Sequence, residues 1–440
     1  MTGVADQPSV VSGERLHPLS PVARGWQVIA ALLVVVGQQY ARGSGWPWSL
    51  LPFAVLPVVF GFLYLSWSRT SFRIDRDELR IDSGVLSRRS RHLRLDRLQA
   101  VDVVRPVAAR MLGLAELRLE VAGGSSAEAP LAYLSEERAR RLRAELLARA
   151  AGIAADTPEA PERPLVQVPL GTLLVSMLIS GSTLFGVAGA VAVVAASAYF
   201  DQPAILAALV PEAVGFVQHW FRHFSTYFDF TVAESPDGLR LRHGLLSHRS
   251  QTVPPGRIQA VRITHPLCWR PLGWVRLEVN VAGYGVSGGQ QGVDTHTLLP
   301  VAPLPVALAV LARVLPEQDL AAVALTRVTE RARWRRPIGW AALACGVDDR
   351  VFVARRGWLR REFDIIPLAK VQSVRLTQGP WERGLRLATL WLDSPAGPVR
   401  VTAAHRDQAE ALALVETVVA GAGSARRAMA PEQWMRPAGS

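Results

Sequence analysis

The sequence predicts an α+β membrane protein in which about four apolar helices alternate with three copies of one small β-rich domain. Two observations lead to this prediction: long apolar blocks interrupt a charged chain, and one residue pattern recurs three times in register. Half of the 440 residues are hydrophobic, yet 20% are charged, so the apolar residues must be concentrated in blocks. The net charge is +12 and comes almost wholly from arginine, since Lys370 is the only lysine.

The first apolar block predicts a transmembrane hairpin over residues 25–68, after an N-terminal tail at 1–24. A membrane span needs about 20 predominantly apolar residues. Arg42 separates two uncharged stretches, 25–41 and 43–68. The tail lacks the compact pattern of a cleaved signal peptide. We therefore expect two helices joined by a short turn near Arg42.

The second apolar block predicts another hairpin over residues 164–221. The run from 164 to 200 contains no charge, and residues 203–221 contain only Glu212. The favoured turn is Asp201-Gln202-Pro203. The alternative is that the run 164–200 folds back on itself and leaves the Glu212 segment at the interface. Because an ionisable group at membrane depth is costly, Glu212 is a candidate intramembrane functional residue.

Arginine placement predicts the orientation of both hairpins. Short flanks on the cytoplasmic side carry an excess of basic residues. Basic residues cluster after the first hairpin and Arg222 follows the second, whereas the second turn has none. We expect a multi-pass protein of the cell membrane, with both termini and all β-rich domains in the cytoplasm.

The internal repeat is found by shifting the sequence against itself. Residues 79–123 align with residues 239–283 without a gap, and 19 of these 45 positions are identical. A third, weaker copy aligns Gly357 with Gly244 and with Gly84. The shared positions, listed by copy, are Gly84, Arg97, Gln99 and Val101; Gly244, Arg257, Gln259 and Val261; Gly357, Lys370, Gln372 and Val374.

Each copy has the pattern of short antiparallel strands followed by one helix, which in the third copy is expected over 405–420. Leu117 to Val121 alternates apolar and polar residues, as a half-buried strand does. The three repeated glycines fall between strand-like runs, where a turn needs positive φ or a bulge. The predicted domains are 69–150, 222–316 and 337–420, with linkers at 151–163 and 317–336 and a C-terminal tail at 421–440.

The repeated pattern resembles the bacterial pleckstrin-homology-like (PH-like) domain of YdbT-like membrane proteins. The residues that carry the resemblance are the glycine turn, Arg97-Leu-Gln-Ala-Val101, Pro106 and Leu112-Gly113, with their counterparts in the second copy. The third copy departs from it, with Lys370 and Ser373 in place of Arg and Ala. The resemblance implies small partly open barrels, each closed by a C-terminal helix, in the cytoplasm and without catalytic activity. It also implies a single-domain PH-like companion as a partner.

No motif for catalysis, a cofactor or a metal emerges. His219 and His223 are spaced i, i+4 on one helix face, but an acidic ligand in HExxH form is missing. The glycine-rich run 283–292 lacks a GK[ST] ending. No nucleic-acid motif accompanies the positive charge. The sequence therefore predicts a protein that is not an enzyme and does not bind nucleic acid.

Two surface features remain candidates for binding. The Arg/Lys-x-Gln-[Ala/Ser]-Val element either fixes a strand start through hydrogen bonds to loop carbonyls, or forms a docking surface between copies or with a partner. Basic residues near an anionic leaflet add attraction of about 1 kcal/mol each. The candidate lipid contacts in the first copy are Arg88, Arg89, Arg91 and Arg94.

The functional prediction is a non-enzymatic, membrane-anchored scaffold or sensor that presents PH-like domains for protein or lipid contacts. The alternative, which the resemblance implies, is a component of a transport or resistance system for membrane-active antimicrobial peptides, in which Glu212 would have a functional role. The membrane, a PH-like companion and self-association are the predicted partners.

Overall fold

The computed structural model describes residues 14–15, 17–18, 20, 51–74, 78–83, 89–94, 98–121, 128–150, 162–235, 238–253, 255–282, 296–315 and 323–428. The chain divides into two compact units. One comprises residues 1–159 with 247–249, and the other comprises residues 160–246 with 250–440.

The first unit contains the first copy of the repeat, which has strands in two antiparallel sheets and a C-terminal helix, α4. One sheet has the order β1-β2-β3-β4, and β5, β6 and β7 lie side by side in the other. Leu142 and Leu146 of α4 are fully buried, as the apolar stripe of that helix predicts. The elements are β1 (Glu14–Arg15), α2 (Leu51–Ser68), β2 (Ser71–Ile74), β3 (Glu78–Ser83), β4 (Arg89–Arg94), β5 (Leu98–Arg105), α3 (Val107–Met111), β6 (Leu114–Val121), β7 (Glu128–Ser135) and α4 (Glu136–Ala150).

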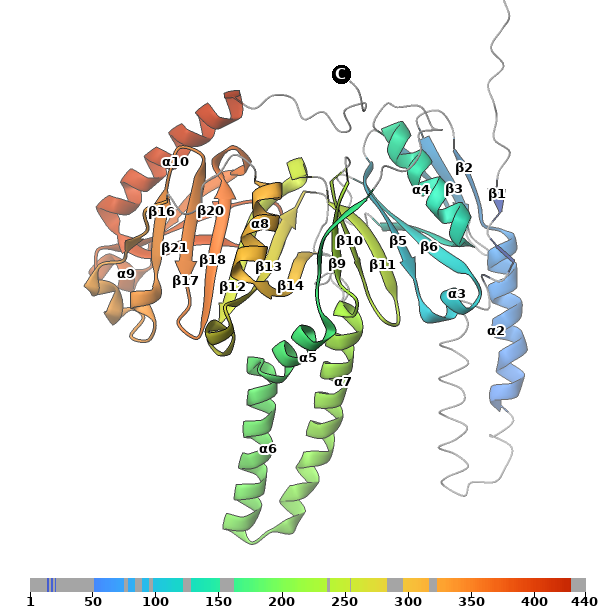
Figure 1. Ribbon diagram of the computed structural model, residues 1–440, viewed down its shortest axis with the longest axis horizontal. Coiled ribbons are helices and arrows are strands. Elements are labelled where there is room, and N and C mark those ends of the chain that lie inside the picture. The colour runs from blue at the N-terminus through green and yellow to red at the C-terminus, as the bar shows by residue number, and fades with distance from the viewer. Residues whose placement is uncertain are drawn as a thin grey trace, which may run out of the picture. The chain divides into compact units, whose positions relative to one another are not determined.

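The second unit begins with a strand and a pair of long apolar helices. The elements are β8 (Arg163–Gln167), α5 (Leu170–Leu178), α6 (Gly181–Phe200), η3 (Pro203–Ala208) and α7 (Leu209–Tyr227). Asp201 takes a left-handed conformation, φ 50°, after the last turn of α6, and the chain reverses there. In Figure 1, α6 and α7 project together from the β-rich body of this unit. Trp220 donates its indole N–H to Thr183 Oγ1 at 3.0 Å and so joins the two helices.

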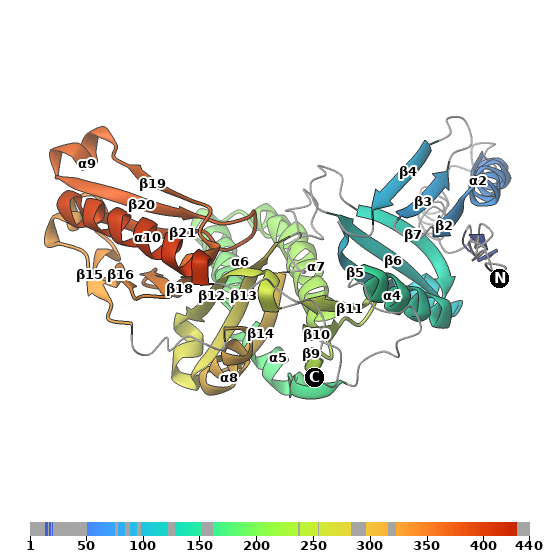
Figure 2. The ribbon, with the colours of Figure 1, turned by 90° about the horizontal axis from the view of Figure 1, so that it is seen from above.

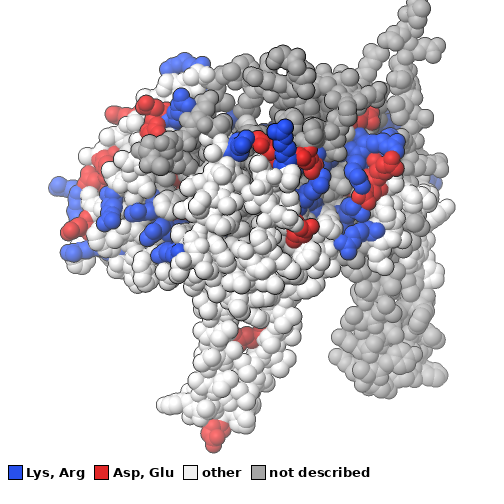
Figure 3. Space-filling view, in the orientation of Figure 1, with Lys and Arg blue, Asp and Glu red and all other residues white. Residues whose placement is uncertain are grey.

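Among the described residues, two helical segments are long and apolar enough to cross a membrane, Gly181–Phe200 and Pro203–Tyr227. Figure 3 shows that the surface of this pair is almost free of charged groups. The predicted span at 25–41 lies outside the described residues, so the expectation of four spans stays a prediction.

The second copy of the repeat follows α7. Its elements are β9 (Thr231–Ser235), β10 (Gly238–His243), β11 (His248–Val253), η4 (Pro255–Arg257), β12 (Ile258–Pro266), η5 (Leu267–Leu272), β13 (Trp274–Val281), β14 (Thr297–Pro303) and α8 (Leu304–Val314). Four buried apolar residues of α8 face the strands, namely Ala307, Val310, Leu311 and Val314.

The third copy completes the second unit. Its elements are β15 (Thr326–Arg327), η7 (Glu330–Trp334), η8 (Trp340–Ala342), β16 (Ala344–Val347), β17 (Val351–Arg356), β18 (Arg360–Pro367), η9 (Leu368–Lys370), β19 (Ser373–Thr377), α9 (Pro380–Gly384), β20 (Leu387–Asp393), β21 (Val401–Asp407) and α10 (Gln408–Ala428). The last helix begins later and ends later than the predicted 405–420. His405 to Asp407 belong to β21, where Arg406 pairs with Ala388 and is buried.

The strand registers confirm the repeat alignment. Ala100 pairs with Glu120, Ala260 with Asn280, and Ser373 with Asp393, which are the same pair in the aligned copies. The first two strands of each copy agree as well, since Ser71↔Asp82, Thr231↔Arg242 and Ala344↔Arg355 are equivalent pairs. A register irregularity before the equivalent Leu117, Leu277 and Leu390 recurs in all three copies.

The expected small barrels are not confirmed. The structure has several antiparallel sheets in place of closed barrels, and in the second unit β12 of copy two pairs with β18 of copy three. One sheet therefore runs β14-β13-β12-β18-β17-β16-β15 across both copies. Because a strand has only two edges, β18 cannot also close onto β19 of its own copy.

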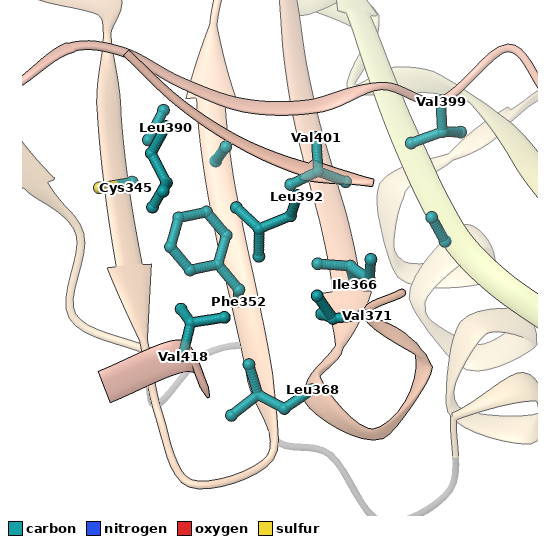
Figure 4. Close-up of a cluster of buried hydrophobic side chains, with 13 residues drawn as sticks. Cys345, Phe352, Ile366, Leu368, Val371, Leu390, Leu392, Val399, Val401 and Val418 are labelled. Atoms are coloured by element: carbon teal, nitrogen blue, oxygen red, sulfur yellow. The ribbon is translucent and has the colours of Figure 1, made fainter. Parts of the chain in front are cut away.

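The core of copy three lies between its two sheets and α10 (Figure 4). Phe352 and Ile366 of the first sheet meet Leu390 and Leu392 of the second, and Val418 of α10 covers them. Ala260 of copy two belongs to the same buried cluster. The two copies thus share a core as well as a sheet. Gly421 of α10 approaches Leu368 so closely that a Cβ there would lie 2.7 Å from the leucine side chain.

Candidate interface between repeat copies

The junction of copies two and three is formed by antiparallel residue pairs between β12 and β18. They run from Val261↔Ile365 to Pro266↔Arg360. One further backbone bond, from the N–H of Leu267 to the carbonyl of Leu359 at 2.8 Å, extends the contact past the end of the strands. Backbone pairing of this kind supplies affinity, while the side chains set the register.

A buried ion pair lies within this junction. Arg262 Nε donates to Asp364 Oδ1 at 2.6 Å, and Arg262 Nη2 donates to Asp364 Oδ2 at 3.2 Å. The two residues are directly opposite across the strands. The Asp364 side chain is 0% exposed and that of Arg262 is 8% exposed. Arg262 Nη1 also donates to the carbonyl of Pro398 at 2.8 Å, so the guanidinium ties β12 to two segments of copy three.

Further charges surround the pair and form a network. Arg356 Nε lies 2.8 Å from Glu362 Oε2 and 3.5 Å from Asp364 Oδ2. Burial alone would lower the pKa of Arg262, but its hydrogen bond to Asp364 and the charges of nearby carboxylates raise it instead. Burial raises the pKa of Asp364, and the neighbouring guanidiniums offset this only in part. The arrangement holds Arg262 charged inside the protein.

Asn280 makes a second polar contact across the junction. Its Nδ2 donates to the carbonyl of Val399 at 2.7 Å, and its Oδ1 accepts from the N–H of the same residue at 2.9 Å. Asn280 is fully buried. Gly397 lies against it, because a Cβ at that position would be 2.1 Å from Asn280 Oδ1. The loop between β20 and β21 therefore packs onto β13 of copy two.

The repeated basic element takes part in the same contact. Lys370 Nζ donates to the carbonyl of Gly256 at 2.8 Å, which links the element of copy three to the residue that precedes the element of copy two. Gln259 Nε2 donates to the carbonyl of Arg257 at 3.3 Å, as expected for a residue that fixes a strand start. The side chain of Gln372 is exposed. One contact lies within a copy and the other joins two copies, and the role of the element stays a prediction.

The remaining repeat positions are buried, half-buried or in turns where the structure describes them. Val101 and Val261 are buried, and Val374 is half-buried against the core of copy three. Gly244 and Gly357 have φ values of 111° and 83°, as a turn with positive φ requires. Gly84 and Arg97 lie outside the described residues, and so does the side chain of Gln99.

The candidate lipid contacts are described only in part. Arg89, Arg91 and Arg94 lie on β4, opposite Ser83, Ile81 and Glu78 of β3. Their side chains and the whole of Arg88 lie outside the described residues. The structure therefore places Arg89, Arg91 and Arg94 on one strand, and the contact of the four arginines with lipid remains a prediction.

Glu212 lies in the first turn of α7 and faces α6. A Cβ at Gly189 would be 2.7 Å from Glu212 Oε1, so the glycine makes room for the carboxylate. Glu212 helps to line a cavity of about 230 Å³ with Gly186, Val187, Ala190, Leu209, Ala213 and Phe216. Within the described residues, no group of three or more His, Cys, Asp and Glu side chains could hold a metal ion.

Sequence reasoning did not single out Arg262, Asp364 or Asn280. Arg262 directly follows the repeated element, and the equivalent residues are Asp102 and Arg375. A charged residue at the same strand position in all three copies is the signal that could have drawn attention to this site, since a solvated strand face needs no such recurrence.

This fold, a tandem of two-sheet domains with a C-terminal helix beside a pair of apolar helices, defines a membrane protein built from PH-like repeats. The bacterial PH domain model matches residues 20–150, 182–318 and 304–417, and the chain belongs to that family. The chain is also similar to the UPF0699 transmembrane protein YdbT of Bacillus subtilis (strain 168). The two are 24% identical over 267 residues, which cover 52% of this chain and 53% of the relative. The match thus spans about half the length of that relative. These similarities point to non-catalytic domains in a membrane protein.

Proposed function

We propose that the chain is a non-enzymatic scaffold or sensor, anchored in the membrane, that presents its PH-like domains to the cytoplasm for protein or lipid contacts. The observation that supports this most is the junction of copies two and three. The shared sheet and the buried Arg262–Asp364 pair make one platform of two domains, next to the apolar helices α6 and α7. A rigid platform beside a membrane anchor suits presentation of surfaces better than chemistry.

The cytoplasmic orientation is tested by thiol labelling in intact cells. Cys345 is buried, so replacing Cys268 with serine gives a background for single introduced cysteines. Gln202→Cys lies in the exposed turn between the apolar helices, and Ser424→Cys lies on the exposed side of α10. A membrane-impermeant maleimide should label Gln202→Cys directly and Ser424→Cys only after permeabilisation. The reverse pattern would contradict the orientation.

Lipid contact by the first copy is tested with the full chain in nanodiscs of neutral lipid. Vesicles that contain phosphatidylserine should bind these nanodiscs at low salt and release them at high salt. The variant with Arg88, Arg89, Arg91 and Arg94 all changed to glutamine should bind more weakly. Equal binding of the two proteins would remove these residues from the proposal.

The cavity beside Glu212 favours one alternative function, a role in transport of or resistance to membrane-active peptides. In this case the carboxylate, held between α6 and α7, would act on a substrate or proton at membrane depth. Glu212→Gln keeps the shape and removes the charge. Loss of peptide resistance in cells that carry this variant at normal abundance would support the transport role, whereas full resistance would favour the scaffold.

A further inference from the structure

The last sheet of the third copy ends in β19, and no described strand pairs with one of its two edges. The strand order is β19-β20-β21, so β20 lies on one side of β19 and no described strand lies on the other. Figure 2 shows β19 on the side of β20 away from β21. An exposed edge presents a row of backbone N–H and C=O groups that another strand can pair with.

β19 is the structural equivalent of β12, whose corresponding edge is occupied. Arg375 corresponds to Arg262, and Asp393 corresponds to Asn280 in the alignment of the two copies. In copy two, β18 covers this edge, and the segment from Ser394 to Val399 covers the adjoining face of the sheet. No described residues take these places at β19.

Exposure shows the difference between the two equivalent surfaces. Arg262 and Asn280 have relative exposures of 7% and 0%. Their counterparts in copy three have side-chain exposures of 60% for Arg375 and 32% for Asp393. Thr264 is buried, whereas the equivalent Thr377 is exposed. The same residue positions that form a buried junction after copy two are open to solvent after copy three.

We propose that β19 and the adjoining sheet face receive a PH-like domain of a second polypeptide, which adds an antiparallel strand to β19. By the pattern of the known junction, the added strand carries an aspartate or glutamate opposite Arg375, as Asp364 lies opposite Arg262. Charge selects the partner and backbone pairing supplies the affinity. The partner is therefore a domain shaped like copy three itself, with an acidic residue at one defined position.

Arg375 is held at this edge by Asp393 of its own copy, so a partner carboxylate would share the guanidinium with Asp393 or displace it. Arg375 Nε and Nη2 donate to the two carboxylate oxygens of Asp393 at 2.6 and 2.7 Å. Trp391 lies beside it, with the guanidinium carbon 5.9 Å from the ring centroid. The indole N–H of Trp391 donates to Thr377 Oγ1 at 2.9 Å, so the surface around the arginine is ordered before any partner binds.

A second copy of this chain is a poorer partner because of like charge. The strand of the first copy that is equivalent to β18 is β4, since Ile81↔Arg91 and Ala354↔Asp364 are the same pair in the alignment of copies one and three. Arg91 thus takes the position of Asp364. Pairing of β4 with β19 of another molecule would set Arg91 opposite Arg375, and like charges directly opposite each other destabilise a sheet.

The inference rests on the proposed scaffold function, for which it names a partner and a surface. Its test measures the association of purified chains, so a negative result would leave the labelling test of orientation intact.

The experiment converts the chain's own β4 into the proposed partner strand. Arg91→Asp places an acidic residue where the partner would have one, and keeps Arg375 and Asp393 unchanged. In sedimentation velocity in detergent, R91D should shift to larger species as its concentration rises, and the wild-type chain should not. The double variant R91D/R375D again sets like charges opposite each other and should return to the wild-type behaviour.

Disulfide capture checks the register of the pairing. By equivalence with Ile263↔Phe363, position 376 of one molecule lies opposite position 90 of the other. In chains that carry R91D and Cys268→Ser, Leu376→Cys mixed with Ser90→Cys should give a cross-linked dimer. The matched control, Leu376→Cys mixed with His92→Cys, is displaced along the strand and should give much less.

Two results would overturn the proposal. If R91D has the wild-type sedimentation profile and gives no cross-link, β19 does not accept a strand of this kind. If the wild-type chain associates and cross-links as well as R91D, charge does not select the partner, and a second copy of the chain occupies the surface.

Discussion

Arg386 of the third copy occupies the turn position that Gly273 holds in the second copy, with the same left-handed backbone. The φ angles are 54° for Arg386 and 65° for Gly273. Glycine adopts this conformation without steric cost, whereas an L-residue with a Cβ is strained by roughly 1 kcal/mol. The third copy therefore keeps the turn geometry after losing the glycine that favours it.

Opposite substitutions at this turn should have opposite effects. Arg386→Gly should raise the free energy of unfolding of the third copy by about 0.5–1 kcal/mol, because it relieves the strain. Gly273→Ala should lower the free energy of unfolding of the second copy by about 1 kcal/mol. No atom lies within 4 Å of the added Cβ, so the only cost is the backbone strain of a left-handed alanine. Thermal unfolding in detergent, followed by tryptophan fluorescence, measures both. A destabilised Arg386→Gly would show that the arginine side chain matters more than its backbone.

Gly357→Ala should destabilise the third copy far more than an ordinary glycine substitution. Its φ is 83°, and a Cβ would lie 1.8 Å from the carbonyl oxygen of Arg360. Only a movement of the backbone could relieve this clash, because the carbonyl is part of the main chain. We expect a loss of roughly 2 kcal/mol or more, since strain and overpacking add. Gly384→Ala, where nothing lies within 4 Å, is the control and should be nearly neutral. Limited proteolysis of both variants compares them, and equal resistance would contradict the prediction.

Removing one member of the Arg262–Asp364 pair should weaken the junction strongly. Arg262→Met leaves a buried carboxylate without its bidentate partner, and such changes cost about 3–5 kcal/mol. Hydrogen exchange of the β12 and β18 amides should accelerate. The double variant R262M/D364L buries no unpaired charge and should recover much of the loss. Arg360→Met is the control: it removes the pair with Glu362, in which Arg360 is 53% exposed, and should cost under about 1 kcal/mol. An equally large effect there would argue against a special role for burial.

The hydrogen bonds to the carboxylate of Glu382 predict that the third copy loses stability in acid. Burial alone would raise the pKa of Glu382, but hydrogen bonds from the N–H of Gly379, from His405 and from Thr389 lower it below 4.5. Since the folded-state pKa is below the unfolded value, this stabilisation is present above about pH 4.5 and is lost as the pH falls through the folded-state pKa. Unfolding midpoints between neutral and acidic pH measure the effect.

Glu382→Gln should lower the unfolding midpoint at neutral pH. On acidification, the midpoint of this variant should fall less than that of the wild type. The exposed Glu416 on α10 provides the control, because its change to glutamine removes a carboxylate that has no such cluster around it. Parallel pH profiles of the wild type and Glu382→Gln would contradict the assignment.

The repeat architecture could be predicted because it depends on local patterns. The alternation around Leu117, the glycines at 244 and 357 and the gapless alignment of the copies define strands, turns and equivalent positions, and the strand registers agree with them. The way in which the sheets close could not be predicted. A strand such as β18 has the same residue pattern whether it pairs with its own copy or with the preceding one.

The residues of the interface could not be predicted from the sequence either. Arg262 and Asp364 lie far apart in the chain, and neither differs in sequence from the many solvated charges around them. Burial gives the pair its importance, and burial depends on which sheets meet.

The sequence by itself determined the number of copies, their register and the positions of the apolar blocks. These follow from residue periodicity, from turn geometry and from the length of uncharged runs, all of which act over short distances along the chain. Only the tertiary structure decided that copies two and three share one sheet and one core, and that no described strand pairs with the second edge of β19. The physical reason is that backbone N–H and C=O groups are the same at every residue, so side-chain patterns define the faces of a strand but not the neighbour that completes its edge.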